Sequence, residues 1–125
     1  MSNPSNLAKK DLSHVNLASA NLAGADLHEA SLRNATLKET NLEGADLTSA
    51  DLSHANLAGA SLRNASASHA NMADADLRDT DLEGTNLRGA SLGGAKLSDA
   101  QRTAAAAAGA DLDRGGGEGE AASGN

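Results

Sequence analysis

The chain has 125 residues, a formal net charge of −7 at pH 7, and no cysteine, phenylalanine, tyrosine or tryptophan. With only one valine and no isoleucine besides, it lacks the bulky side chains that fill the core of a sandwich, a barrel or a doubly wound sheet. The missing cysteines exclude disulfides and thiolate metal sites, and the acidic balance disfavours direct binding of nucleic acid, whose phosphates require lysine and arginine.

The first residues of the chain carry no targeting signal. Residues 1–4 form a short lead-in without the basic region and apolar run of a secretion signal. No apolar stretch approaches the roughly 20 residues of a membrane span, so no membrane contact is expected. The absence of cysteine fits a reducing compartment, and we expect a cytoplasmic protein.

Residues 5–100 repeat with a period of five. Leucine occupies seventeen of the nineteen positions in the series from Leu7 to Leu97, and the exceptions are Ala67 and Met72. Alanine usually lies two residues before the leucine, asparagine or aspartate usually lies between them, and the two following positions are mixed. The repeated unit is therefore A-[D/N/S]-L-x-x.

A five-residue period suits neither a regular helix nor a straight strand. On an α-helix the leucines would precess by about 140° per unit, and on a strand they would alternate between the two faces. A chain that turns once per unit returns each leucine to the inside, with alanine on the same inner face. The two variable residues then form the corner, where suitable turn formers are Gly24, Gly44, Gly59, Asn34 and Asn64.

Units such as 25–29, 45–49 and 55–59, with the sequences ADLHE, ADLTS and ANLAG, resemble consecutive members of the pentapeptide-repeat family. The resemblance implies an all-β solenoid, namely a right-handed quadrilateral β-helix with four units in each coil. Nineteen units then make just under five coils. At about 4.8 Å between stacked strands, the rod is expected to be roughly 20–25 Å tall.

In this fold the central residues of the units stack in four columns. The small alanines let the walls close around the leucines, and we expect larger residues at the alanine positions to strain the coil. Ala67 interrupts one column, and we expect the flexible Met72 side chain to lean into the gap. The predicted structural core consists of Leu22, Leu27, Leu32, Leu37, Leu42, Leu47, Leu52, Leu57, Leu62, Met72, Leu77, Leu82, Leu87 and Leu92.

The C-terminal end permits two interpretations of the alanine-rich cap at residues 101–114. Ser98 and Gly109 flank the alanine run as the N-cap and the C-terminal glycine of a short helix would. The unit ADLDR that follows is in phase with the repeat, so a further degenerate coil with Arg102 facing inward is the alternative. We favour the helix because a buried, unpaired arginine is costly. Residues 115–125 have the glycine, glutamate and serine content of a disordered tail.

No residue pattern in the sequence points to an enzyme, a metal or a cofactor. A leucine-filled rod has no cleft for a nucleophile or a general base. Outward positions hold all the histidines, none of them stacked on an adjacent coil, so we expect solvated side chains and not metal ligands at His14, His28, His54 and His69. We therefore expect a non-enzymatic protein-binding module or scaffold whose partner is another protein.

The resemblance offers a sharper alternative, because some pentapeptide-repeat proteins imitate DNA and bind gyrase, a type II topoisomerase, in quinolone resistance. Duplex DNA carries about one negative charge per 1.7 Å. Residues 1–100 hold thirteen acidic and eight basic side chains, which is dilute for a DNA mimic. One concentration stands out, and it is the predicted partner patch of Asp74, Asp76, Asp79, Asp81 and Glu83. A self-assembling structural solenoid, with a homodimer through the C-terminal end, is the third alternative.

Overall fold

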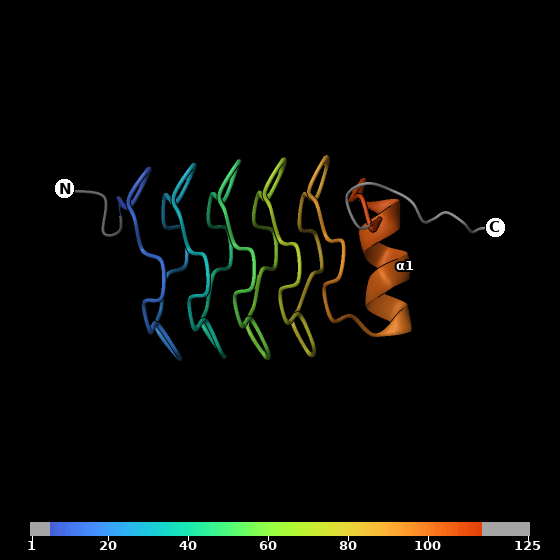
Figure 1. The fold of residues 1–125 in the computed structure, drawn as a ribbon, viewed down its shortest axis with the longest axis horizontal. Coiled ribbons are helices and arrows are strands. Elements are labelled where there is room, and N and C mark those ends of the chain that lie inside the picture. The colour runs from blue at the N-terminus through green and yellow to red at the C-terminus, as the bar shows by residue number, and fades with distance from the viewer. Residues whose placement is uncertain (1–5, 114–125) are drawn as a thin grey trace.

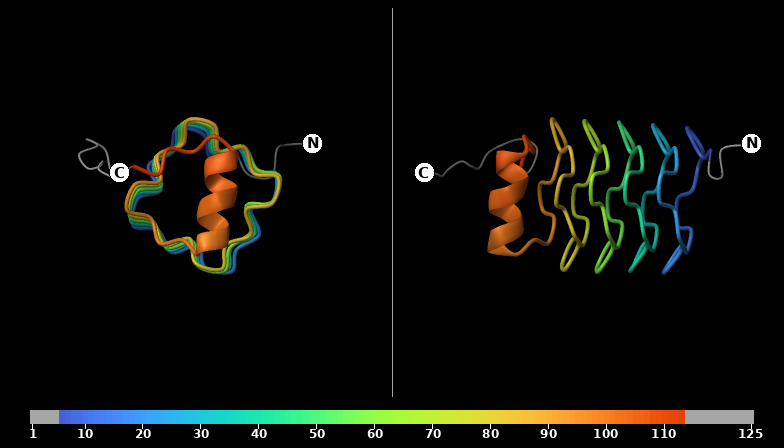
Figure 2. Two further views of the ribbon diagram at one scale, coloured as in Figure 1. Left: turned by 90° about the vertical axis from the view of Figure 1, so that its right-hand side faces the viewer. Right: turned by 180° about the vertical axis from the view of Figure 1, so that it is seen from behind.

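The rod is built of coils that each use twenty residues. The computed structural model describes residues 6–113. Within them, all sixteen isolated backbone bridges are parallel and join residues twenty positions apart, such as Asp26 and Asp46. Four five-residue units therefore complete a coil. The coils stack in register along one axis (Figure 1), with the four-sided outline seen end-on in Figure 2.

The coils comprise residues 6–25, 26–45, 46–65 and 66–85, followed by an incomplete fifth coil at 86–97. The faces are numbered 1 to 4 by the leucine columns that contain Leu27, Leu32, Leu37 and Leu42, in that order. The lead-in predicted for residues 1–4 and the tail predicted for 115–125 lie outside the described residues.

Each corner of a coil is a tight turn. The leucine carbonyl accepts a hydrogen bond from the N–H three residues later, as Leu27 does from Ala30 at 3.1 Å. The residue two positions after the leucine has a positive φ, which is the conformation that a type II turn requires at its third residue. Six of these corners carry glycine and twelve carry another residue. The predicted turn formers all have this conformation: Gly24, Gly44, Gly59, Asn34 and Asn64.

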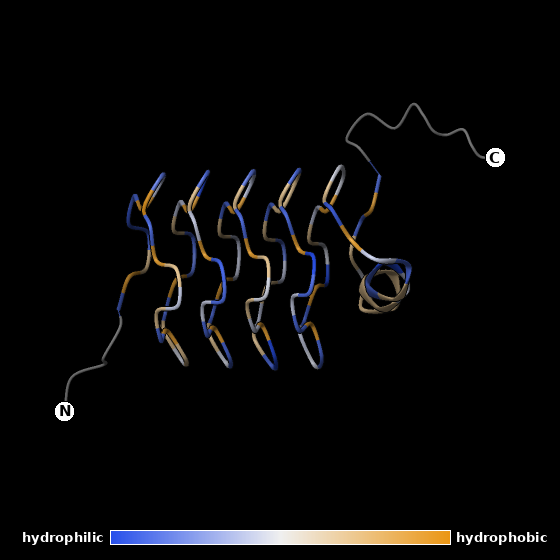
Figure 3. Cartoon of the chain, turned by 90° about the horizontal axis from the view of Figure 1, so that it is seen from below, coloured by the Kyte–Doolittle hydropathy of each residue, from blue (hydrophilic) through white to orange (hydrophobic). Residues whose placement is uncertain are grey.

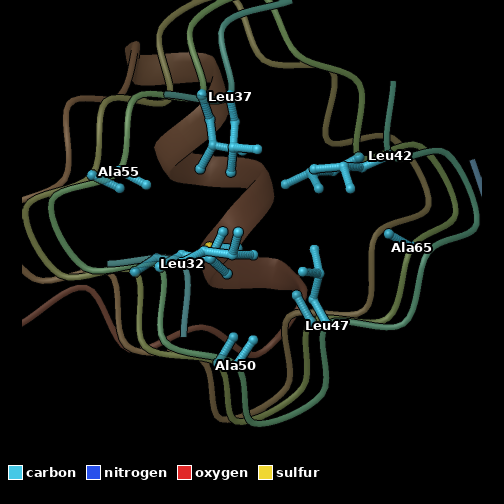
Figure 4. Packing of buried hydrophobic residues seen from close by; sticks show 14 of the residues in the cluster. Leu32, Leu37, Leu42, Leu47, Ala50, Ala55 and Ala65 are labelled. Atoms are coloured by element: carbon cyan, nitrogen blue, oxygen red, sulfur yellow. The ribbon is translucent and has the colours of Figure 1, made fainter. Parts of the chain in front are cut away.

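Leucine fills the interior of the rod. In Figure 4, Leu32, Leu37, Leu42 and Leu47 point from the four walls toward the axis, and the alanines lie nearer the corners. All but one of the predicted core residues are buried. Leu82 is the exception and is only partly buried, because the chain leaves the wall before a further unit can stack over it on face 4.

Two departures from the repeat are accommodated inside the rod. Ala67 and Met72 are both fully buried, and the filling of the gap by the methionine stays a prediction. Threonine replaces the inner alanine three times, and each hydroxyl donates to a leucine carbonyl of the preceding coil, as Thr80 does to Leu57 at 2.7 Å. At these three positions the hydroxyl uses a spare carbonyl lone pair, and the strain expected from larger residues stays a prediction.

One helix, α1 (Asp99–Ala107), lies across the C-terminal mouth of the coil (Figure 2). A capping box starts it: the Ser98 hydroxyl accepts from the Gln101 N–H at 3.1 Å, and the Gln101 side chain accepts from the Ser98 N–H at 2.8 Å. Gly109, with φ +95°, ends it in a Schellman motif in which the next N–H donates to the Ala105 carbonyl at 3.0 Å. Ala105 is buried against the leucine core.

Gln101 also joins α1 to the exposed edge of the fourth coil. In the coils, the N–H of the residue before each leucine donates to the carbonyl twenty-one residues earlier, as Asp81 does to Ala60 at 2.9 Å. At position 101 the backbone is helical, and the side-chain Nε2 donates to the corresponding carbonyl of Thr80 at 3.0 Å. The same Nε2 donates to the Leu77 carbonyl at 2.6 Å.

Each interpretation of the C-terminal end describes part of it. Residues 99–107 are helical, and Arg102 is exposed. Asp111 then re-enters the ladder as the bridge partner of Ser91, twenty residues earlier, and Leu112 packs against the core. Figure 3 shows α1 end-on beyond the last coil. Along the coils, the same figure shows hydrophilic and hydrophobic residues in alternation. None of the helical segments within residues 6–113 has the length and apolar character needed to span a membrane.

Candidate functional site

The interior of the described rod is filled mainly by apolar side chains. The largest fully buried side chains of residues 6–113 are leucines and one methionine. The buried polar residues in this range are three threonines and Ser53, and all four side chains are hydrogen-bonded. The described interior therefore contains no titratable group of the kind that a catalytic cleft requires.

The acidic patch predicted from the sequence wraps around the fourth coil and is not one flat surface. Twenty residues make a full circuit, so the ten residues 74–83 pass around about half of the rod, from the corner that ends face 2 over face 3 onto face 4. Arg63 lies 3.1 Å from Asp81 and 3.0 Å from Glu83, and both of those carboxylates are thereby ion-paired. Recognition of a partner by this patch stays a prediction.

Two carboxylates of this patch are held in the charged state. The Arg78 guanidinium donates to both oxygens of Asp76, through Nε at 2.9 Å and Nη2 at 2.7 Å, and lowers the pKa of Asp76 to about 2. The pKa of Asp81 is lowered chiefly by the hydrogen bond from the Glu83 N–H, with Arg63 adding to it. A basic partner would have to compete with an arginine at each carboxylate.

Asp74 of this patch lies together with two further aspartates at the C-terminal end of face 2. They line a hollow of about 490 Å³ whose lining residues, none of them cationic, are Asn71, Ala73, Asp74, Ser91, Gly93, Asp111 and Asp113. Asp111 and Asp113 reach this face because the chain returns to the ladder after α1. Sequence reasoning missed this grouping, although the in-phase unit ADLDR was the signal for it.

A larger hollow of about 780 Å³ lies between the start of α1 and the last coils. Its lining carries charges of both signs, with Arg78, Lys96 and Arg102 beside Asp79. Arg78 is already paired with Asp76. This mixture of charges does not select a class of ligand.

His28 is the histidine with two aspartates beside it. Its Nδ1 lies 2.7 Å from Asp26 Oδ1, and Asp46 of the next coil adds a third donor, so that three ligand atoms lie within 4.8 Å of one another. The hydrogen bond with Asp26 raises the pKa of His28 and lowers the pKa of Asp26. The sequence prediction of solvated histidines compared them only with one another. The overlooked signal was an aspartate two residues before a histidine, followed by a second aspartate twenty residues after the first.

The repeat and the coil geometry match one protein family. The family model described as "Pentapeptide repeats (8 copies)" matches residues 11–48, 45–84 and 75–114, which together make up most of the chain. The chain is a pentapeptide-repeat protein. Solved structures of the same family support the right-handed quadrilateral β-helix that the resemblance implied. A comparison with functionally curated proteins found no match.

Three solved pentapeptide-repeat structures, all from cyanobacteria, are similar to this chain. HetL of Nostoc is 34% identical with a TM-score of 0.63, and the match covers 73% of this chain and 49% of HetL. Rfr23 of Cyanothece is 41% identical with a TM-score of 0.55, covering 70% and 64%. The Nostoc protein alr5209 is 32% identical with a TM-score of 0.53, covering 86% and 84%. The pentapeptide-repeat protein therefore matches about half of HetL and just under two thirds of Rfr23.

Proposed function

We propose that this pentapeptide-repeat protein is a non-enzymatic binding module whose partner is a protein that presents a basic segment. The filled core leaves binding to the outer surface, and the ladder of parallel bridges holds the side chains of each face at fixed spacing. HetL, which is similar over about half of its length, is involved in heterocyst differentiation regulation. This similarity is compatible with a regulatory role that the protein exerts by binding its partner.

The hollow on face 2 is the observation that carries the choice of a basic partner. Asp111 and Asp113 line it together with Asp74, whose carboxylate lies 3.7 Å from His54 Nε2, and the lining residues include no lysine or arginine. Within the predicted patch, by contrast, Asp76 and Asp81 are each bonded to an arginine. The carboxylates of Asp111 and Asp113 lie in this hollow and are better placed to accept lysine or arginine side chains from a partner, which gives specificity and fast association.

The test compares two triple variants of equal charge change. Asp74→Asn, Asp111→Asn and Asp113→Asn remove the charges of the hollow, and Asn at position 111 can still accept the hydrogen bond that the Asp113 N–H donates at 2.9 Å. Asp76→Asn, Asp81→Asn and Glu83→Gln remove the same number of charges from the predicted patch. Binding of a fluorescently labelled arginine-rich peptide is measured by anisotropy at physiological salt, where weak long-range attraction is screened.

We expect the hollow variant to bind the peptide at least about tenfold more weakly, and the patch variant to lose less, since a tenfold change needs only about 1.4 kcal/mol. Equal losses would show general electrostatic attraction and overturn the choice of face 2. A gyrase supercoiling assay addresses DNA mimicry: inhibition at micromolar concentration by both variants would favour that alternative. Light scattering that shows oligomers of the full chain would favour self-assembly.

A further inference from the structure

One step of the ladder stacks two carboxylates directly on each other. Of the sixteen bridged pairs, Asp26 with Asp46 is the one in which both residues are acidic. In the other pairs at least one member is neutral, or, for Asp76 with Lys96, the charges are opposite. Like charges directly opposite each other on paired backbones are destabilising. The described part of the chain therefore tolerates such a stack only here, on face 1 between coils 2 and 3.

The same step is where His28 lies. Its Nδ1 is 2.7 Å from Asp26 Oδ1, and one ligand atom from each of Asp26, His28 and Asp46 lies within 4.8 Å of the other two. No other trio of histidine, cysteine or acidic side chains among residues 6–113 converges in this way. The stacked carboxylates of Asp26 and Asp46 and the nearby imidazole of His28 are separate observations at the same place. Both favour a cation between these side chains.

We propose that Asp26, His28 and Asp46 form a binding site for a divalent transition-metal ion, with Zn²⁺ as the representative ligand. Two carboxylate oxygens and one imidazole nitrogen suit first-row divalent ions, and Zn²⁺ accepts both donor types at about 2.0–2.2 Å. Donors on a shared ion lie up to about 4 Å apart at these bond lengths. Small side-chain rotations close the site, and water completes the coordination because all three side chains are only partly buried.

The backbone prepares this site. Oδ1 of Asp26 accepts from the His28 N–H at 3.2 Å, and Oδ1 of Asp46 accepts from the Thr48 N–H at 3.0 Å, so each carboxylate is oriented by its own turn. The hydrogen bond from the Leu27 N–H to the Asp46 carbonyl, at 2.8 Å, fixes the spacing of the two coils. A bound ion would link residues twenty positions apart and neutralise both carboxylates.

Protons compete with the metal at His28. The charged groups that face its imidazole are Asp26, Glu29 and Asp46, all acidic, and the hydrogen bond with Asp26 raises the pKa of His28. Metal ligands must be deprotonated, and metal binding therefore releases a proton here.

The test uses the full chain, Zn²⁺ as the probe and isothermal titration calorimetry at about pH 7.5. Asp46→Asn and His28→Gln remove one ligand each. Asparagine is compatible with the wall at this position, since the same column carries Asn6 and Asn86. His69→Gln on face 1 is the matched control, because it removes a histidine outside the cluster. Thermal melts of all variants without metal check that the fold is retained.

We expect saturable binding of one Zn²⁺ per chain, weakened at least about tenfold by Asp46→Asn and by His28→Gln and unchanged by His69→Gln. Calcium should bind much more weakly than Zn²⁺, because it prefers a shell of oxygen ligands. The proposal is overturned if Zn²⁺ does not saturate the protein below about 1 mM, if either ligand variant binds like the wild type while remaining folded, or if the control variant loses binding equally.

Discussion

Replacing Gln101 by alanine removes the side chain that holds α1 on the end of the rod. The change deletes the acceptor for the Ser98 N–H and the donor for the Thr80 and Leu77 carbonyls. The Thr80 carbonyl lies at the edge of the fourth coil where no further wall segment follows, because the chain becomes helical at position 101. The Leu77 carbonyl would keep the Thr80 N–H at 3.1 Å, and the Thr80 carbonyl would need water entering between α1 and the coil.

The expected cost is about 2 kcal/mol. Each of the two hydrogen bonds to the coil contributes about 1 kcal/mol net, and the lost half of the capping box adds about 0.5 kcal/mol. The higher helix propensity of alanine offsets a few tenths of a kcal/mol. For a domain of this size, about 2 kcal/mol lowers the melting temperature by roughly 8 °C or more if unfolding is cooperative. In a solenoid, part of the loss can instead appear as local detachment of the terminal element.

Far-UV circular dichroism during thermal and urea unfolding measures the global loss, and hydrogen exchange of the α1 amides measures local detachment. Gln101→Glu is the informative companion, because glutamate keeps the capping-box acceptor but cannot donate to the two carbonyls. It should be at least as destabilising as alanine. Arg102→Ala, an exposed neighbour, should change stability by less than about 0.5 kcal/mol. If Gln101→Ala and Gln101→Glu both match the wild type in unfolding and exchange, α1 is not held by this residue.

Two further predictions concern the same end of the rod. Gly109→Ala should lower the free energy of unfolding in urea by about 1–2 kcal/mol, because φ is +95° and a Cβ would lie 3.2 Å from the Arg88 Cα. Gly24→Ala should cost less, because nothing lies near its added Cβ. Equal costs of the two substitutions would contradict the steric reasoning. Asp76, with its pKa lowered to about 2 from 3.8, stabilises the fold fully above about pH 4, and this contribution is lost as the pH falls toward 2. Asp76→Asn should remove about 1 kcal/mol of this acid dependence, discounted because Arg78 is 62% exposed, and an unchanged acid transition would refute the assignment.

Much of the fold followed from local pattern. The leucine period placed the core residues, and glycine or asparagine after the leucine marked corners that have positive φ. Leu82 was predicted to be buried because its own unit is regular, but its burial depends on the unit above it, which α1 replaces. The hydrogen bond of an inner threonine could not be foreseen from its unit, because the carbonyl that accepts its hydroxyl belongs to a different coil.

The candidate sites were less predictable for the same reason. A run of acidic residues along the chain suggested a patch, but consecutive residues pass around the rod and meet arginines from neighbouring coils, as Asp81 meets Arg63. Asp74 and Asp111 line the same acidic hollow, although α1 separates them along the chain. A five-residue motif does not reveal these neighbours until the number of units per coil is known.

By itself, the amino-acid sequence determined a chain that turns once every five residues around a leucine core, because no straight helix or strand returns a residue to the inside with that period. Only the tertiary structure decided which outward side chains become neighbours. The twenty-residue register brings His28 between Asp26 and Asp46, and the path of α1 sets where the chain re-enters that register at Asp111. Both depend on contacts between coils, which the residues of a single unit do not encode.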